Sequence, residues 1–135
     1  MFNKKKQPPI KSLIAQGTRV DGNFMFEDGL RVDGEVKGDI RAENGGSSLL
    51  VISELAKVTG SIHAGHVIIN GWVQGPVTAT DLLELQPKAR IEGDVSYKAL
   101  EMHQGATISG QLHPRSGEQA ADEDKPTLKL AANNR

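Results

Sequence analysis

The sequence predicts an all-β protein, a single-domain parallel β-helix of about six coils with three short strands in each. A short phrase centred on glycine recurs along the chain, and apolar residues alternate with other residues on both sides of that glycine. No ten-residue stretch has the apolar spacing of an amphipathic helix. Each such repeat buries its apolar face only against its neighbours, so that stacked coils share one continuous core.

The recurring phrase is an apolar residue, any residue, glycine, any residue and a second apolar residue. Its six copies are centred on Gly22, Gly38, Gly60, Gly75, Gly93 and Gly110. Successive glycines of the phrase are 16, 22, 15, 18 and 17 residues apart. A second alternating apolar pair precedes each phrase, with Ile14 as its remnant in the first unit. Alternation with period two predicts short strands that bury one face, and the glycines predict tight turns between them.

One interval is long because the segment Glu43 to Ser48 is inserted between two copies of the phrase. Its Asn, Gly and Ser residues favour turns, so we expect a loop that bulges from one corner of the column. The repeat divides the chain into three regions. We expect a disordered N-terminal tail over residues 1–13, the β-helix over residues 14–114, and a polar, disordered C-terminal tail over residues 115–135.

Composition excludes several classes of function. The net charge of the 135-residue chain is -1, which argues against the broad basic face of a nucleic-acid-binding protein. There is no cysteine, so disulfides and thiolate chemistry are excluded. No apolar run is long enough to span a bilayer, and the segment Met1 to Ile10 lacks the apolar core of a signal peptide. These features predict a cytoplasmic protein.

Residues with potential for chemistry are scattered through the sequence. His63 and His66 are three residues apart, whereas His103 and His113 lie in later coils, so we expect ordinary surface histidines. Several carboxylates occupy outward positions of the alternation, where a solvated face is the usual explanation and a catalytic pair the alternative. They are Asp21, Asp33, Glu35, Asp39, Glu92 and Asp94. With no phosphate-binding loop or cofactor fingerprint either, we predict no catalytic, cofactor-binding or metal site.

The two ends of the predicted column suggest how the protein works. An open coil presents unpaired backbone groups around an apolar core, and solenoids normally hide it beneath a capping element. Pro8 and Pro9 disfavour a helix before the first coil, and the acidic segment after Leu112 has no apolar face. Two open ends can stack on one another and extend the column into a filament without a nucleotide. The alternative is that the tails fold over the ends and leave a monomer or a small closed oligomer.

The N-terminal tip combines apolar and cationic residues. Met1 and Phe2 precede Lys4, Lys5 and Lys6. Burial of Phe2 in a bilayer contributes about 1.5–3 kcal/mol, and each lysine near an anionic surface about 1 kcal/mol. One copy therefore binds weakly, whereas a filament presents many copies and gains avidity. The alternative is a solvated, unstructured start of the chain.

A single tryptophan, Trp72, occupies an outward position directly before an apolar residue of the phrase. An exposed tryptophan is typical of a contact with a partner or with an adjoining filament. The alternative is a ring that lies flat along the aliphatic part of Lys57 or Arg90.

Taken together, the repeat and the tip resemble the bactofilins, a family of bacterial polymer-forming cytoskeletal proteins. The resemblance covers nearly the whole chain. It rests on Ile14-Ala-Gln-Gly-Thr-Arg-Val-Asp-Gly-Asn-Phe24, Leu30-Arg-Val-Asp-Gly-Glu-Val-Lys-Gly-Asp-Ile40, Pro87-Lys-Ala-Arg-Ile-Glu-Gly-Asp-Val95 and the Met1-Phe-Asn-Lys start.

The resemblance implies a right-handed β-helix between disordered tails, which assembles into nonpolar filaments without a nucleotide. It also implies a position beneath the inner membrane and a scaffold that places enzymes of cell-wall synthesis or remodelling. By position, the membrane contact falls to Met1, Phe2, Lys4, Lys5 and Lys6, and the polymerisation interface to Val20, Phe24, Ile108 and Leu112. The insertion departs from the even spacing of coils and leaves the local register open.

Two other classes compete with this interpretation. A left-handed acyltransferase requires a strict six-residue period with eighteen residues per coil, and a β-helical polysaccharide lyase requires a longer chain. A monomeric adaptor would use Trp72 and the tail segment Thr127-Leu-Lys-Leu130 to bind a partner. Sedimentation separates these classes, because an adaptor stays small and a filament pellets.

Overall fold

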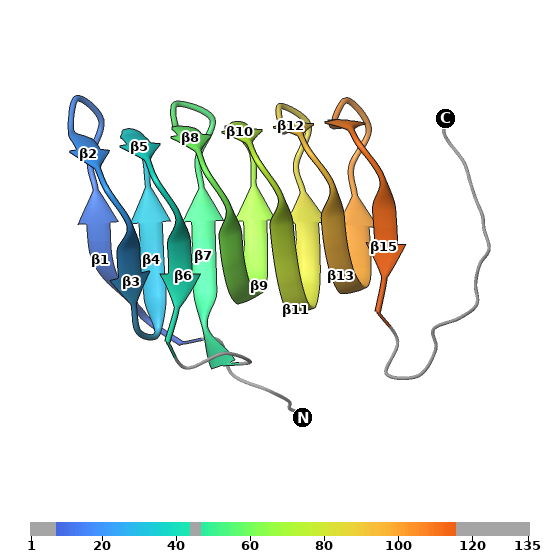
Figure 1. Ribbon diagram of the computed structural model, residues 1–135, viewed down its shortest axis with the longest axis horizontal. Coiled ribbons are helices and arrows are strands. Elements are labelled where there is room, and N and C mark those ends of the chain that lie inside the picture. Colours follow the sequence, from blue (N-terminus) through green and yellow to red (C-terminus); the bar gives the residue numbers. More distant parts are fainter. Residues whose placement is uncertain (1–7, 44–46, 116–135) are drawn as a thin grey trace.

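The computed structural model, which describes residues 8–43 and 47–115, is a parallel β-solenoid of six coils (Figure 1). All strands pair in parallel with the coil before or after them. Within the described ranges there is no α-helix, and hence no helix that is long and apolar enough to cross a membrane. The predicted all-β fold of stacked three-stranded coils is confirmed. The right-handed winding remains what the family resemblance implies.

The solenoid has three faces, each formed by one strand segment from every coil. The first face contains β1 (Ile10–Ile14), β4 (Gly29–Val32), β7 (Leu49–Ile52) and the second halves of β9 (Ile62–Ile69), β11 (Val77–Leu85) and β13 (Val95–Met102). The second face contains β2 (Arg19–Asp21), β5 (Glu35–Lys37), β8 (Lys57–Thr59), β10 (Trp72–Gln74), β12 (Arg90–Glu92) and β14 (Thr107–Ser109). The third face contains β3 (Phe24–Phe26), β6 (Ile40–Ala42), the first halves of β9, β11 and β13, and β15 (Leu112–Pro114).

The core consists of columns in which successive coils place similar apolar residues at the same register. Their side chains are β-branched or otherwise aliphatic, which suits a pleated surface with one buried face. The second face contributes Val20, Val36, Val58, Val73, Ile91 and Ile108, and the first contributes Leu30, Leu50, Val67, Leu83 and Leu100. In the interior coils these residues are at most 1% exposed. Burial of one such side chain contributes about 1.5–3 kcal/mol, so the columns account for much of the stability.

A ladder of corner glycines allows the coils to stack closely. Gly60 has φ +146°, a conformation that L side chains rarely adopt, and a Cβ atom there would collide with the carbonyl oxygen of Gly38 one coil earlier. Only glycine meets both requirements. The recurring glycine of the sequence phrase therefore serves backbone geometry and close packing between coils.

Polar side chains beside this corner also join one coil to the next. The Ser61 N–H donates to Asp39 Oδ1 at 2.9 Å, and the Gln111 N–H donates to Asp94 Oδ1 at the same distance. In the first coil, Asn23 Oδ1 accepts from the Asp39 N–H at 3.1 Å. The backbone N–H of Ser61 lowers the pKa of Asp39, because the hydrogen bond favours the carboxylate. These carboxylates have a structural partner in the neighbouring coil.

The insertion leaves the register intact on both sides. Before it, β6 pairs with β3 and β9, and after it Leu49 pairs with Gly29 of β4 and His66 of β9. Ser48, at the end of the inserted segment, is 1% exposed, and its Oγ accepts a hydrogen bond from the Gly65 N–H at 2.8 Å. Residues 44–46 lie outside the described ranges. The open question of the local register is thus answered at the flanking strands.

The first strand begins at Ile10 rather than at residue 14. Ser12 pairs with Leu30 and takes an inward position that the later coils fill with an aliphatic residue. The alternation is further interrupted by a register shift between Ile10 and Ser12. A polar residue in an apolar column, together with this irregularity, hid the strand from the sequence pattern.

Candidate functional site at the ends of the solenoid

Each end of the solenoid presents a coil whose strands are paired on one side. At the N-terminal end, β1, β2 and β3 pair with β4, β5 and β6. At the other end, β14 pairs with β12 and β15 with β13. Among residues 8–43 and 47–115, no strand covers the outer edges of these terminal coils. Both ends therefore offer backbone hydrogen-bonding groups around an apolar interior, which is the arrangement that accepts a further strand.

The last coil exposes the apolar side chains that are buried in every interior coil. Leu112 pairs with Val95, and Met102 with Leu85. Leu112 and Met102 are each 45% exposed, whereas Val95 and Leu85 are fully buried. Ile108 is half-buried above the rest of the core. Among the described residues no further coil covers these side chains, so their exposure follows from their place in the last described coil rather than from a change of residue type.

The first coil covers several of its inward apolar residues, although Ile10 of β1 is 45% exposed. Val20 and Phe24 are half-buried and pack against the core, and Ile14 and Phe26 are only 5% and 6% exposed. The two ends therefore differ in which apolar residues they expose: Ile10 of β1 at the first coil, and Met102 and Leu112 at the last.

An ion pair fixes the outermost strand at the N-terminal end. Lys11 Nζ of β1 lies 2.6 Å from Asp28 Oδ2 in the turn before β4. The hydrogen bond to Asp28, together with its negative charge, raises the pKa of Lys11. At this exposed site the pair is screened by solvent, so it fixes geometry more than it contributes to stability.

The four residues assigned by position to polymerisation all lie at inward positions of the terminal coils. Val20 and Phe24 belong to the first coil, and Ile108 and Leu112 belong to the last. The sequence interpretation omitted Met102, although the alternation of Leu100 and Met102 marks both as inward. Whether these residues form an interface stays a prediction.

Trp72 lies on the outer surface of the second face and has partners within its own sheet. Its Nε1 donates a hydrogen bond to Glu92 Oε2 at 3.2 Å, and Lys57 Nζ lies 4.6 Å from the centre of its ring. Gln74 Nε2 donates to the other oxygen of Glu92 at 3.0 Å. The ring is half-buried, and the ammonium group of Lys57 lies over its face. A contact of Trp72 with a partner or a second filament stays a prediction.

The remaining residues singled out in the sequence lie outside the described ranges or on the surface of the column. Met1, Phe2, Lys4, Lys5 and Lys6 lie outside the described residues, as does the tail segment ending at Leu130. The predicted outward carboxylates are exposed or half-buried on the surface of the column. His63 is half-buried, and burial lowers its pKa.

These features define a class of protein: a short parallel β-solenoid whose terminal coils are uncovered by any described strand, with an apolar column that continues to both of them. A family model described as bactofilin, polymer-forming cytoskeletal, matches residues 12–113. The chain belongs to the bactofilin family.

Two curated relatives come from Myxococcus xanthus (strain DK1622). The chain is 25% identical to bactofilin BacO over 111 residues, which cover 82% of this chain and 85% of BacO. It is 23% identical to bactofilin BacP over 101 residues, which cover 75% of this chain and 40% of BacP. No solved structure gives a significant match.

Proposed function

We propose that this bactofilin is a structural scaffold that polymerises end to end through its terminal coils, without a nucleotide and without enzymatic activity. The main support is the contrast between Leu112, which is 45% exposed, and Val95, which is fully buried at the same position one coil earlier. A second copy stacked on the end would restore the environment of an interior coil. The polymer-forming description of the family agrees with this role.

The end contact combines two favourable terms. Complete burial of an aliphatic side chain contributes about 1.5–3 kcal/mol, so covering the exposed parts of Leu112 and Met102 supplies part of that amount for each. Pairing of the free strand edges on three faces satisfies backbone groups at the same time. Association must offset about 4–15 kcal/mol of lost translational and rotational freedom. A contact that uses the whole coil is therefore needed, and a single side chain is not enough.

In the nonpolar arrangement implied by the family resemblance, like ends meet: first coil with first coil, and last coil with last coil. Phe24 would then lie in one contact and Leu112 in the other. Each contact would be symmetric, with the same surface on both copies. Such a polymer has no direction, which suits a static scaffold.

The N-terminal tip would attach this polymer to the inner face of the cytoplasmic membrane. Phe2 would insert among the lipids while Lys4, Lys5 and Lys6 contact anionic headgroups. A polymer repeats this weak contact many times and so binds stably. There it would position proteins of cell-wall synthesis or remodelling, and the outer faces, including Trp72, would be available to such partners.

Charge placed at one end tests the polymer directly. Leu112→Arg places a cation on the exposed core of the last coil, and Phe24→Arg does so in the first. If like ends meet, each variant sediments as a dimer and the double variant as a monomer, while the unmodified chain pellets. The controls are His113→Arg and Met25→Arg, outward neighbours in the same strands, which should still pellet. Normal pelleting of the double variant would exclude the end-to-end mechanism and favour another contact.

Vesicle flotation tests the membrane contact separately. The full chain should float with anionic phospholipid vesicles, and a chain lacking residues 1–6 should remain in the dense fraction. Phe2→Ala and the joint replacement of Lys4, Lys5 and Lys6 by Gln should each weaken binding. Equal flotation of the full and shortened chains would remove the tip from the mechanism without affecting the polymer.

A further inference from the structure

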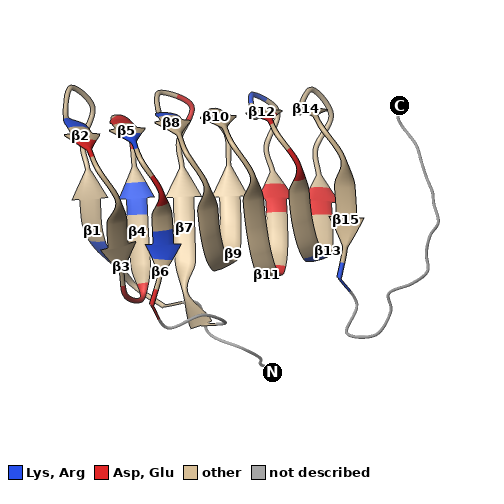
Figure 2. Ribbon diagram, in the orientation of Figure 1, with Lys and Arg blue, Asp and Glu red and all other residues tan. Residues whose placement is uncertain are grey.

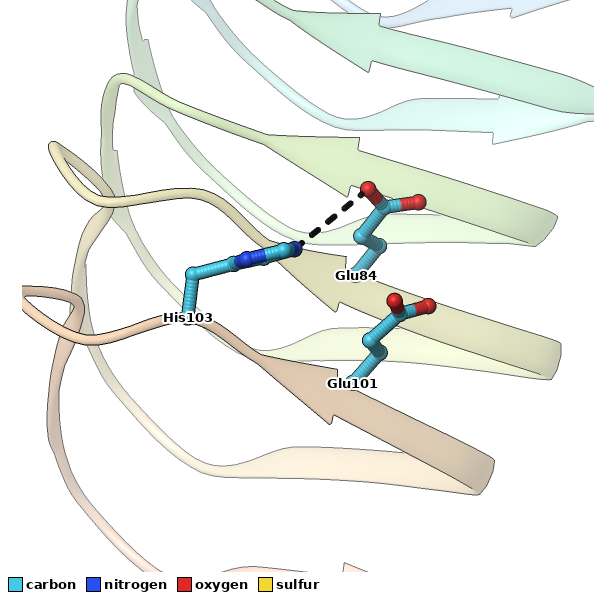
Figure 3. Close-up of side chains that lie close together, drawn as sticks. All are labelled: Glu84, Glu101 and His103. Atoms are coloured by element: carbon cyan, nitrogen blue, oxygen red, sulfur yellow. Dashed lines mark ion pairs between the residues drawn. The ribbon is translucent and has the colours of Figure 1, made fainter.

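We propose that the first face of the solenoid carries a binding site for a divalent transition-metal ion, formed by Glu84, Glu101 and His103. The candidate ligand atoms of these three residues all lie within 4.8 Å of one another (Figure 3). The site lies on the outer surface of the first face, between the fifth coil and the last one. Its ligands point away from the column, whereas the proposed polymer contact uses the inward residues and the strand edges, so the metal site does not rest on the proposed polymerisation.

The register of two neighbouring strands brings the carboxylates together. Glu84 of β11 pairs directly with Glu101 of β13, so both side chains project from the same face of adjacent coils. Figure 2 shows acidic residues at corresponding places on β11 and β13. Like charges at directly opposed positions destabilise a sheet unless a cation lies between them. A cation between Glu84 and Glu101 would therefore relieve the repulsion of the two carboxylates.

Within the described residues, two histidine side chains lie close to the Glu84 carboxylate. His103 follows β13, and its Nε2 lies 3.8 Å from Glu84 Oε2 (Figure 3). On the other side of the same carboxylate, His66 Nε2 lies 3.7 Å from Glu84 Oε1. Among the ion pairs of the described residues, neither Glu84 nor Glu101 is paired with a lysine or an arginine. The cluster thus joins two carboxylates to imidazole nitrogen, which is a set of metal ligands.

The burial of these residues suits one fixed ligand and two mobile ones. The Glu84 side chain is 20% exposed and also accepts a hydrogen bond from Gln86 Nε2 at 3.4 Å. Glu101 is exposed, and the His103 side chain is 45% exposed. Ligand atoms around a tetrahedral Zn²⁺ lie about 3.3–3.6 Å apart, given metal–ligand distances of about 2.0–2.2 Å. Small rotations of the Glu101 and His103 side chains, which move their ligand atoms by about 1 Å, would bring these atoms to that spacing from the Glu84 carboxylate.

The ligand set selects the class of metal. Two carboxylates, one imidazole and a water molecule suit Zn²⁺ and neighbouring divalent transition metals, whereas Ca²⁺ and Mg²⁺ prefer oxygen ligands throughout. His66, which lies against Glu84, would act as a positioning residue that orients this ligand. Because Glu84 belongs to the fifth coil and Glu101 to the sixth, the bound ion would cross-link the last coil to its neighbour.

Titration of the tag-free, chelator-treated full chain with Zn²⁺ tests the site, by calorimetry and by competition with a chromophoric chelator. We expect one Zn²⁺ per chain, and at least about tenfold weaker binding in Glu101→Gln and in His103→Ala. The matched control is His113→Ala. The His113 side chain is 49% exposed, and its Nε2 lies 4.0 Å from Asp94 Oδ2, so it resembles His103, but within the described residues it belongs to no cluster with a second carboxylate. This variant should bind as the unmodified chain does, and Mg²⁺ should not compete.

Hydrogen exchange gives a second readout. Zn²⁺ should slow exchange in β13 and β14 of the unmodified chain and have no such effect in His103→Ala. The proposal is overturned if the unmodified chain binds no stoichiometric Zn²⁺, if the cluster variants bind normally, or if His113→Ala loses as much affinity as His103→Ala. Binding should persist in the Leu112→Arg, Phe24→Arg double variant, so that failure of polymerisation and failure of metal binding are told apart.

Discussion

The fifth and sixth coils place similar residues in the same columns, yet the two coils present different surfaces. Leu85 and Val95 are fully buried, whereas Met102 and Leu112, which pair with them, are each 45% exposed. Burial in this fold thus depends on having a neighbour on both sides. The comparison shows why a solenoid without a covered end is suited to self-association: one more coil would give the last coil the environment of the one before it.

The largest difference between interior and terminal coils is expected at the corner glycines. In Gly60→Ala the new Cβ meets the carbonyl oxygen of Gly38 at an unfavourable φ, so we expect a loss of about 4 kcal/mol or more. Gly22 has φ +130°, but a Cβ at this residue would have no neighbouring atom within 4 Å, because no described coil precedes it. Gly22→Ala should therefore cost about 1–3 kcal/mol. Both substitutions can be measured by urea denaturation in the background of the non-polymerising Leu112→Arg, Phe24→Arg variant. Equal losses of unfolding free energy at Gly60 and Gly22 would contradict the role of close stacking between coils.

Truncation of paired core residues should give the next largest difference. Leu85→Ala leaves a cavity in a buried column and should destabilise by about 2–5 kcal/mol. Met102→Ala removes a side chain that is 45% exposed and should cost less than half as much in dispersed protein. In the polymer, the Met102 substitution should also reduce assembly. If Met102→Ala destabilised the non-polymerising protein as much as Leu85→Ala does, another part of the molecule would have to cover the last coil.

The smallest expected effect concerns Tyr97, the chain's single tyrosine, which lies beneath the last coil. Burial raises its pKa. The folded-state pKa lies above the unfolded value near 10, so the folded protein favours the neutral phenol. The free energy of unfolding therefore has its full contribution from Tyr97 below about pH 10 and loses it as pH rises through the folded-state pKa. Ultraviolet titration should show this raised pKa in a chain ending at Arg115. In a chain ending at Gln111, which lacks β15, the pKa should fall toward 10, and an unchanged value would contradict cover by β15.

Most of the fold could be predicted from the sequence because its two signals are local. The alternation of apolar residues and the recurring glycine depend only on near neighbours, and together they define the six coils. The first strand was missed in part because Ser12 occupies an apolar column. The register across the insertion at Glu43 to Ser48 required pairing between distant strands, which no local pattern encodes.

The candidate sites were less predictable for the same reason. The inward position of Leu112 follows from the alternation, but its exposure depends on whether a further coil covers it. Glu84 and Glu101 are aligned by the repeat, whereas the approach of His103 depends on the turn after β13. The sequence interpretation therefore treated His103 as a separate surface histidine. Contacts made by turn residues between coils are visible only once the coils are stacked.

Negative-stain electron microscopy of the purified full chain without added nucleotide tests the central claim most directly. A parallel sample lacking residues 1–6 shows whether the tip is needed for assembly. The account predicts filaments in both samples, formed by the solenoid itself, and short particles in the Leu112→Arg, Phe24→Arg double variant. Small particles from the full and shortened chains would contradict end-to-end polymerisation and favour a monomeric adaptor.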